Sequence, residues 1–431
     1  MRTVYRIAAP LAALTMLSGA AMADTTADAL LKVLVRKGIL TQEEAGAVKA
    51  EAEKEVTPPA APTPKEAPKP TAPKYSLSGY IRARAAFQKY ANPSSQFSDR
   101  RTRLTLKSAG ETSRGVISWE VGPATSSLRD GYWEWNATPA VKKVSGLTLK
   151  AGQYMKPFGL ENERSDRDTE FPACPVGIAT FFPNQRDLGL QLSKGLDRNT
   201  DLSFAVMNGN GSGSATALGK DDDNYKDVLL RLTHSVKKVG TFAITGYRGR
   251  NTIAPVAAVA AVTGFDDLNG NGVRDPGEST VIISPGKAAV PGFNGDRNRF
   301  GLDAVLDNVL GGQVRTEYIR AKDVATNLGA GAKYANADAQ AWFVYYGHPV
   351  ASDNTVAVRY DVYDPDVNND YRLLGDGEVK TFGVVGIHQV SEAFKLSLAW
   401  ERPRITRYAP SSKTAQTRNE DVLTLQGQYQ F

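Results

Sequence analysis

Four arginines stand at alternating positions in two neighbouring segments of the sequence. Arg82 and Arg84 alternate with apolar residues, and Arg101 and Arg103 lie two apart in the next segment. Alternate residues of a β-strand point to one face, so we expect the four guanidinium groups to lie side by side on paired strands. Adjacent cations repel one another. The pattern therefore predicts something anionic at this place that offsets the positive charge.

A second group of residues has the spacing of a metal site. The calcium-binding loop of EF-hands is matched position by position by Asp267-Leu-Asn-Gly-Asn-Gly-Val-Arg-Asp-Pro-Gly-Glu278. The predicted ligands are Asp267, Asn269, Asn271, Val273 (through its carbonyl), Asp275 and Glu278. Such hard oxygen ligands suit calcium, and we expect weak binding of the extracellular type, at ~10⁻⁴–10⁻³ M. Residues 256–262 and 280–283 indicate strand or coil instead of flanking helices, so a metal-free turn is the alternative.

The sequence contains no recognisable set of catalytic residues. The three histidines, His234, His348 and His388, lie in separate segments without the spacing of metal ligands. A nucleophile elbow and a phosphate-binding glycine loop are also missing. The sequence therefore predicts a protein that is not an enzyme.

The amino terminus has the pattern of a secretory signal peptide. Arg2 and Arg6 precede a mostly apolar stretch, and Ala21-Met22-Ala23 is a small-x-small cleavage site. We expect removal of residues 1–23, which leaves 50 basic and 46 acidic residues and a net charge of +4. This small excess does not indicate nucleic acid as a partner. The single cysteine, Cys174, excludes an intramolecular disulfide.

From residue 75 to residue 431 the sequence consists of short segments of alternating character, separated by turn residues. Sixteen strands are predicted, at about 75–88, 100–108, 115–122, 131–138, 146–155, 188–195, 201–208, 225–235, 240–249, 297–307, 312–321, 338–347, 354–364, 378–388, 394–402 and 420–431. Short connections alternate with mostly longer ones. An even strand number with short turns at one end is typical of exported bacterial barrels. The predicted fold is all-β: a 16-stranded antiparallel transmembrane β-barrel.

The last predicted strand indicates which face meets lipid. Leu423, Leu425 and Tyr429 share one face, and the opposite face carries glutamines. We expect the apolar face to contact lipid and the polar face to contact water. The terminal Phe431 resembles the signal that the outer-membrane assembly machinery recognises. Together with the export signal, this predicts a location in the bacterial outer membrane.

Between the signal peptide and the barrel, two segments have a different composition. Residues 24–56 predict a helical segment in which Thr41-Gln-Glu-Glu44 has the spacing of a capping box. Residues 57–74 are rich in proline, alanine and lysine and predict an extended linker. The helical segment is either a short trimeric coiled coil that contacts the cell wall from the periplasm, or a frayed helix on a disordered spacer.

The face opposite the lipid-facing residues lines the lumen, and it carries more basic than acidic side chains. The basic residues are Arg82, Arg84, Arg101, Arg103, Lys107, Lys150, Arg231, Arg299, Arg315, Arg359 and Lys395. The acidic ones are Glu120, Glu134, Asp303, Glu317, Asp361 and Glu401. Rings of arginine and lysine favour anions in a pore. For any single arginine, a structural role opposite an acidic group of the wall is the alternative.

The long connection at residues 156–187 is predicted to fold into the lumen and narrow it. It carries the acidic residues Glu161, Glu163, Asp166, Asp168, Glu170 and Asp187, and the basic residues Lys156, Arg164, Arg167 and Arg186. Its carboxylates either pair with the arginine cluster, which would mute an anion preference, or face away from the narrowest point. The sequence leaves both arrangements open.

Two motifs resemble the phosphate-selective porin O and P family. They are Gly152-Gln-Tyr-Met-Lys-Pro-Phe-Gly-Leu-Glu161 and Arg186-Asp-Leu-Gly-Leu-Gln-Leu192. The order of signal peptide, helical and proline-rich segment, sixteen strands and terminal phenylalanine is similar as well. The resemblance implies a homotrimer whose lumen carries an arginine ladder and whose constriction carries lysines. Lys156 is the only lysine of the loop and so departs from that pattern.

The leading functional prediction is a passive outer-membrane channel for small anions, such as phosphate or oligophosphate. One alternative is a weakly selective general or organic-anion porin, in which the acidic loop cancels the arginines. Another is a structural outer-membrane anchor with a calcium-stabilised exterior loop.

Overall fold

The chain divides into two compact units, Met1–Pro70 and Thr71–Phe431. The computed structural model describes residues 32–33, 35–38, 41–55, 73–89, 94–122, 126–137, 146–182, 186–209, 211, 224–253, 255, 262–265, 276, 279–284, 292–327, 333–368, 377–408 and 415–431. Among these residues, no helix has both the length and the apolar character needed to cross a membrane.

The described part of the first unit contains helix α2, Gln42–Glu55. The Thr41 N–H donates to Glu44 Oε2 at 2.8 Å, and the Glu44 N–H donates to Thr41 Oγ1 at 3.3 Å. These two reciprocal bonds form the capping box expected at this position. The signal peptide and nearly all of the proline-rich segment lie outside the described residues, and the coiled coil stays a prediction.

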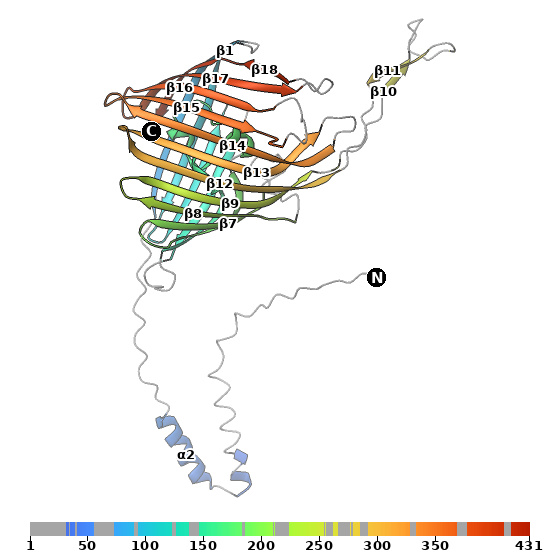
Figure 1. Cartoon of the computed structure of the whole chain (residues 1–431). Coiled ribbons are helices and arrows are strands. Elements are labelled where there is room, and N and C mark those ends of the chain that lie inside the picture. Colours follow the sequence, from blue (N-terminus) through green and yellow to red (C-terminus); the bar gives the residue numbers. More distant parts are fainter. Residues whose placement is uncertain are drawn as a thin grey trace. The chain divides into compact units, whose positions relative to one another are not determined.

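The second unit is a closed antiparallel barrel (Figure 1). Its first strands are β1 (Lys74–Gln88), β2 (Ser95–Ala109), β3 (Ser113–Val121), β4 (Ser126–Asn136), β5 (Leu147–Met155), β6 (Arg186–Gly195), β7 (Thr200–Met207), β8 (Asp227–Val236) and β9 (Gly240–Ile253). The ring continues with β12 (Phe293–Val309), β13 (Gly312–Asn327), β14 (Lys333–Pro349), β15 (Asn354–Asp364), β16 (Val379–Gln389), β17 (Phe394–Tyr408), β18 (Ala415–Asn419) and β19 (Val422–Gln430).

β18 and β19 together form one position in the ring. Both pair with β17, β18 along residues 404–408 and β19 along residues 394–401, and only two residues separate them. The barrel therefore has sixteen strands, as predicted. It closes where β1 pairs with β19, which places Arg82 opposite Gln428 and Arg84 opposite Gln426. A separate hairpin of β10 (Val262–Phe265) and β11 (Thr280–Ser284) lies in a segment that the sequence left as strand or coil.

The two faces of the wall have the predicted character. In β19, Leu425 is 47 % exposed on the outside, whereas Gln426 and Gln428 are each 1 % exposed on the inside. Large apolar side chains are exposed around the ring, among them Ile81, Phe87, Trp133, Phe300 and Leu398. An apolar exterior around a polar interior is stable in lipid and would be costly in water.

The apolar core lies inside the ring, where the connection between β5 and β6 packs. This inserted loop (residues 156–182 in its described part) contains α3 (Leu160–Glu163), the 3₁₀ turn Asp166–Asp168 and α4 (Val176–Phe181). Phe158, Phe171 and Phe181 are almost fully buried, and the inner side of β13–β17 meets them largely with alanines. Small residues leave room for the loop: a Cβ on Gly177 of α4 would lie 2.1 Å from the Ala341 Cβ.

Candidate functional site: the charged lumen and its loop

The arginine cluster predicted on the first two strands surrounds one carboxylate of the inserted loop. Arg101 forms an ion pair with Asp166, and Arg103 Nη2 lies 3.3 Å from Asp166 Oδ2. Arg82 donates to the Asp166 backbone carbonyl. Burial raises the pKa of Asp166, but the nearby Arg101 and Arg103 outweigh burial and hold it below its usual range. Asp166 is therefore ionised at neutral pH and offsets part of the cluster's charge.

Other acidic residues of the loop also face basic residues of the wall. Glu170 lies 2.7 Å from Arg315, and Glu163 lies 3.3 Å from Arg231. Asp168 differs, because its side chain is 53 % exposed and pairs with its neighbour Arg167. Of the two arrangements left open by the sequence, pairing with the arginine cluster is adopted by Asp166. Glu163 and Glu170 pair with other arginines of the wall, and Asp168 pairs within the loop.

The basic residues of the loop region are held by acidic partners as well. Lys156 lies 3.1 Å from Asp187, and Arg186 Nε lies 2.8 Å from Asp130. Arg164 bridges Glu161 and Glu170 within the loop. Lys156 and Arg186 therefore hold the two ends of the inserted loop, and Arg164 holds its middle together.

The eleven basic residues assigned to the lumen by parity all lie on the inner face. Several form ion pairs across the wall: Arg231 with Asp303 at 2.6 Å, Arg359 with Asp361 at 3.1 Å and with Glu401 at 2.8 Å, Lys150 with Glu134 at 3.1 Å, and Arg299 with Asp323. Lys395 donates to the backbone carbonyl of Arg167 at 3.2 Å. The structure therefore brings these residues into one charge network and gives most of them a structural partner.

The lumen holds two chambers that the inserted loop helps to line. One, of about 450 Å³, is lined by Arg84, Arg359, Glu401 and loop residues including Cys174, and lies toward the long-loop end. The other, of about 360 Å³, lies toward the short-turn end and is called here the basic chamber. Its charged lining residues are Arg103, Lys107, Lys150, Arg167, Arg186, Asp130 and Glu163. Five cations and two anions line this chamber, so positive side chains outnumber negative ones in its lining. Arg103, Lys150 and Arg167 also pair with carboxylates beyond the lining, Asp166, Glu134 and Asp168.

Tyrosines add hydrogen-bond donors to the basic chamber. The Tyr80 and Tyr154 hydroxyls are buried and have no hydrogen-bond partner among the described residues. Lys150 Nζ lies 5.0 Å from the Tyr132 ring centroid and 5.1 Å from that of Tyr154. Lys107 is exposed to the chamber. An anion here would meet positive charge beside tyrosine side chains that line the chamber. The tyrosines were not predicted from the sequence, although Tyr80 shares the parity of Arg82.

The predicted calcium loop lies outside the described residues, apart from Pro276, and stays a prediction. Among the residues that the structure describes, no group of three or more histidine, cysteine, aspartate or glutamate side chains is arranged to hold a metal ion.

Comparison with solved structures identifies the fold. The outer membrane channel DcaP of Acinetobacter baumannii superposes with a TM-score of 0.57 at 11% identity, over 84% of this chain and 98% of that chain. The trimer form of OmpT, an outer membrane protein of Vibrio cholerae, superposes with a TM-score of 0.56 at 9% identity, over 84% of this chain and 100% of that chain. An anion-selective porin from Comamonas acidovorans superposes with a TM-score of 0.54 at 10% identity, over 83% of this chain and 100% of that chain. No family model matches the chain, and no curated protein matches it.

At this identity the likeness establishes the fold, which is that of outer-membrane porins. The closed ring of sixteen strands, the apolar exterior and the loop inside the lumen define a transmembrane barrel of that class. In such barrels the chain termini and short turns face the periplasm, and the long loops face the exterior. The basic chamber accordingly lies on the periplasmic side of the lumen.

Proposed function

We propose that this protein is a passive outer-membrane channel for small anions. The observation that carries the proposal is the basic chamber, where five cationic side chains face two carboxylates. Charges lining a cleft with low-dielectric walls raise the local concentration of ions of opposite sign. Arginine and lysine in a pore also replace part of the hydration that an anion loses. The anion-selective porin from Comamonas acidovorans has the same fold, which supports this direction.

Phosphate or oligophosphate is the finer form of this proposal. Arginine, lysine and tyrosine donors in the basic chamber suit phosphate oxygens. The second candidate is a weakly selective or organic-anion porin, and the many ion pairs between loop and wall favour it. Adding inorganic phosphate to a chloride current separates the two: specific binding reduces the chloride current, whereas a weakly selective pore conducts both anions.

Replacing Lys107 by glutamine is expected to weaken anion preference. At ~8 Å in a water-filled chamber, one charge changes the energy of each passing ion by about 0.5 kcal/mol, in opposite directions for chloride and potassium. The chloride-to-potassium permeability ratio should therefore fall about fivefold. Reversal potentials across a planar bilayer with a salt gradient measure this ratio.

The matched control is Lys194→Gln, which removes an exposed lysine from β6 on the outer side of the wall. This variant should keep the wild-type ratio. A wild-type pore that prefers potassium would overturn the anion proposal. A pore without conductance would favour the structural anchor.

Assembly as a homotrimer in the outer membrane belongs to the same proposal. The strands β3, β5 and β7 have nine, nine and eight residues, whereas β12 and β14 have seventeen. The wall is therefore lower on the side of the short strands. Trp119, Trp133 and Trp135 are exposed on that side and offer an apolar surface for contact between copies. Light scattering of the detergent-solubilised protein should give the mass of three chains.

Calcium binding by residues 267–278, and a cell-wall contact through the amino-terminal helical segment, are retained as further proposals. They rest on the EF-hand spacing and on the helical composition described above. Isothermal titration of the purified barrel with calcium up to millimolar concentration tests the first. Absence of heat from binding in that range would remove it.

A further inference from the structure

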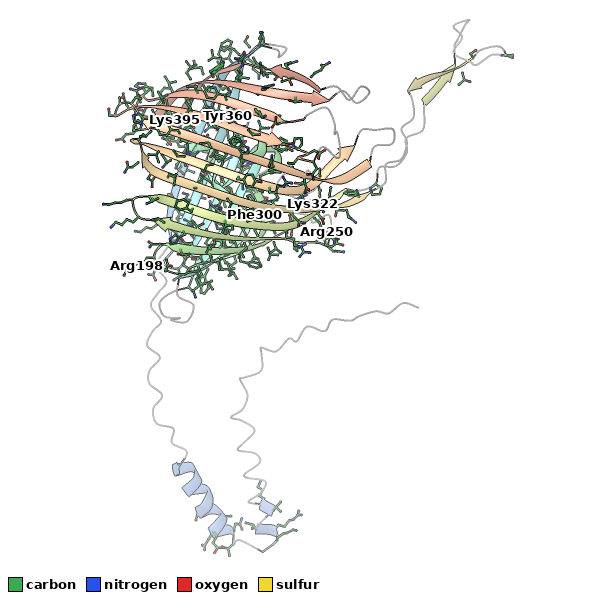
Figure 2. The ribbon with its side chains drawn as sticks, viewed as in Figure 1. Arg198, Arg250, Phe300, Lys322, Tyr360 and Lys395 are labelled. Atoms are coloured by element: carbon green, nitrogen blue, oxygen red, sulfur yellow. The ribbon has the colours of Figure 1, made fainter. Side chains whose placement is uncertain are left out.

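A group of basic side chains lies on the outside of the barrel at its extracellular end. Arg248 and Arg250 belong to β9, Arg320 and Lys322 belong to β13, and Lys226 directly precedes β8. They have the parity of the lipid-facing residues. Figure 2 shows Arg250 and Lys322 toward the same end of the wall, with Phe300 nearer its middle. We call these five residues the outer basic patch.

Strand register sets the height of the patch on the wall. Phe300, an exposed apolar residue of β12, lies between Gly246 of β9 and Arg320 of β13. Two residues further toward the exterior, Asn298 lies between Arg248 and Lys322. At ~3.3 Å per residue, these two cations lie about 7 Å further along the strands than Phe300 does. Arg320 lies at the outer edge of the apolar band, and Arg248 and Lys322 lie beyond it, so the patch extends from that edge toward the level of the lipid headgroups.

Among the described residues, two carboxylates lie close to members of this patch. Asp296 lies 3.8 Å from Lys322, and Asp338 lies 3.9 Å from Arg320, with every partner more than a third exposed. Ion pairs so long and exposed contribute little to neutralising the patch.

The described part of the same rim holds a second basic group, Lys380, Arg402, Arg404 and Arg418. There, three carboxylates lie close by: Glu378 at 2.6 Å from Lys380, Asp421 at 3.6 Å from Arg402 and Glu420 at 2.5 Å from Arg418.

The patch also borders a hollow in the wall. A cavity of about 760 Å³ is lined by residues that include Lys226, Arg248, Arg250 and Asn298. The Arg250 guanidinium lies 4.1 Å from the centroid of the Tyr225 ring, which orients it by a cation–π contact. The hollow gives room for a headgroup beside side chains that are held in position.

We propose that the outer basic patch binds the phosphate groups of an anionic glycolipid in the outer leaflet. Its height matches the headgroup layer, and its charge is complementary to phosphate. Arginine binds phosphate oxygens through two parallel N–H donors, and basic residues next to a bilayer attract anionic headgroups. The patch lies on the lipid-facing side of the wall, so this inference is independent of the proposed channel function.

The test compares lipid binding by the full-length protein and by two double variants in a neutral detergent. Arg248→Gln with Arg250→Gln removes two charges from β9, and Arg320→Gln with Lys322→Gln removes two from β13. Each cation near the membrane surface contributes to the attraction of anionic headgroups. Removing two of them should weaken the binding of bisphosphorylated lipid A roughly 10- to 30-fold in each double variant. Native mass spectrometry over a lipid titration gives the apparent affinity.

Three controls decide between outcomes. Arg198→Gln removes an exposed arginine from a turn at the opposite end (Figure 2) and should bind lipid A as the wild type does. Lipid A without its phosphates should bind the wild type and both double variants equally weakly. Wild-type single-channel conductance in a double variant shows that the barrel is intact.

Unchanged lipid A affinity in both double variants would overturn the proposal. So would inorganic phosphate binding at the patch as tightly as lipid A, because the site would then serve a soluble anion.

Discussion

Replacing Asp166 by asparagine is expected to raise the chloride-to-potassium permeability ratio of the channel by about 30-fold. The wild-type carboxylate lies between Arg101 and Arg103 and is ionised at neutral pH. Removing it leaves an additional positive charge in a largely buried part of the lumen. At ~8 Å and an effective dielectric constant of ~40, that charge changes the energy of each ion by about 1 kcal/mol, with opposite sign for anion and cation.

The position of the inserted loop should survive this substitution. Glu120 remains at 3.2 Å from Arg101 and 2.8 Å from Arg103, so neither arginine loses all of its acidic partners. The aromatic residues Phe158 and Phe181 keep the loop packed against the inner wall. The expected effect is therefore on selectivity, measured as reversal potential, with little change in the thermal unfolding temperature.

Asp168→Asn provides the matched control for this prediction. It removes the same charge from the same 3₁₀ turn, but its side chain is more than half exposed and contacts only Arg167 among the acid–base pairs of the described chain. Water screens such a charge, so a small change of selectivity is expected. Equal shifts in the two variants would mean that ions respond to the overall charge of the loop and not to the arginine cluster.

Sequence alternation was sufficient to predict the barrel and the direction of its side chains. A period of two is imposed by strand geometry, and it held from Arg82 in β1 to Gln428 in β19, which the register places opposite each other. The outer ends were less predictable. β12 to β14 extend several residues beyond the predicted segments because pairing continues above the apolar band, where lipid no longer dictates alternation.

The carboxylate partner of the arginine cluster was not predictable in the same way. Which of the loop's acidic residues meets Arg101 depends on the path of the loop through the lumen, and no strand period applies to that path. The path is set by buried aromatic residues and by alanines on the facing wall, such as Ala339 and Ala341. Alternating alanines on the lumenal parity of β14 were the available signal, since small residues there leave space for an inserted segment.

Gly159→Ala is expected to release the inserted loop from the wall. Gly159 has φ 70° and ψ 172°, a conformation that side chains other than glycine rarely adopt. A Cβ at this position would lie 1.9 Å from Glu317 Oε1. The Glu317 carboxylate accepts hydrogen bonds from the backbone N–H groups of Leu160 and Glu161, each at 3.0 Å. The added methyl group therefore displaces the acceptor that holds the start of α3.

Backbone strain and the loss of these hydrogen bonds both weaken the docking of the loop. Strained backbone contributes about 1–3 kcal/mol, and each lost hydrogen bond about 0.5–1.5 kcal/mol. The backbone pairs of the sixteen strands stay intact, so undocking of the loop should precede unfolding of the barrel. We expect a higher single-channel conductance with frequent open-level fluctuations, and proteolytic cleavage within residues 156–182 that the wild type resists.

Two further glycine variants separate loop release from a general defect of the barrel. Gly246→Ala places a methyl group in open space on the lipid-facing side of β9 and should behave as the wild type does. Gly177→Ala brings α4 against the Ala341 side chain and should reproduce the fluctuating conductance by a different route, because it disturbs the same loop without touching Glu317. A Gly159→Ala channel with wild-type conductance and protease resistance would show that the apolar packing of Phe158 and Phe181 alone keeps the loop in the lumen.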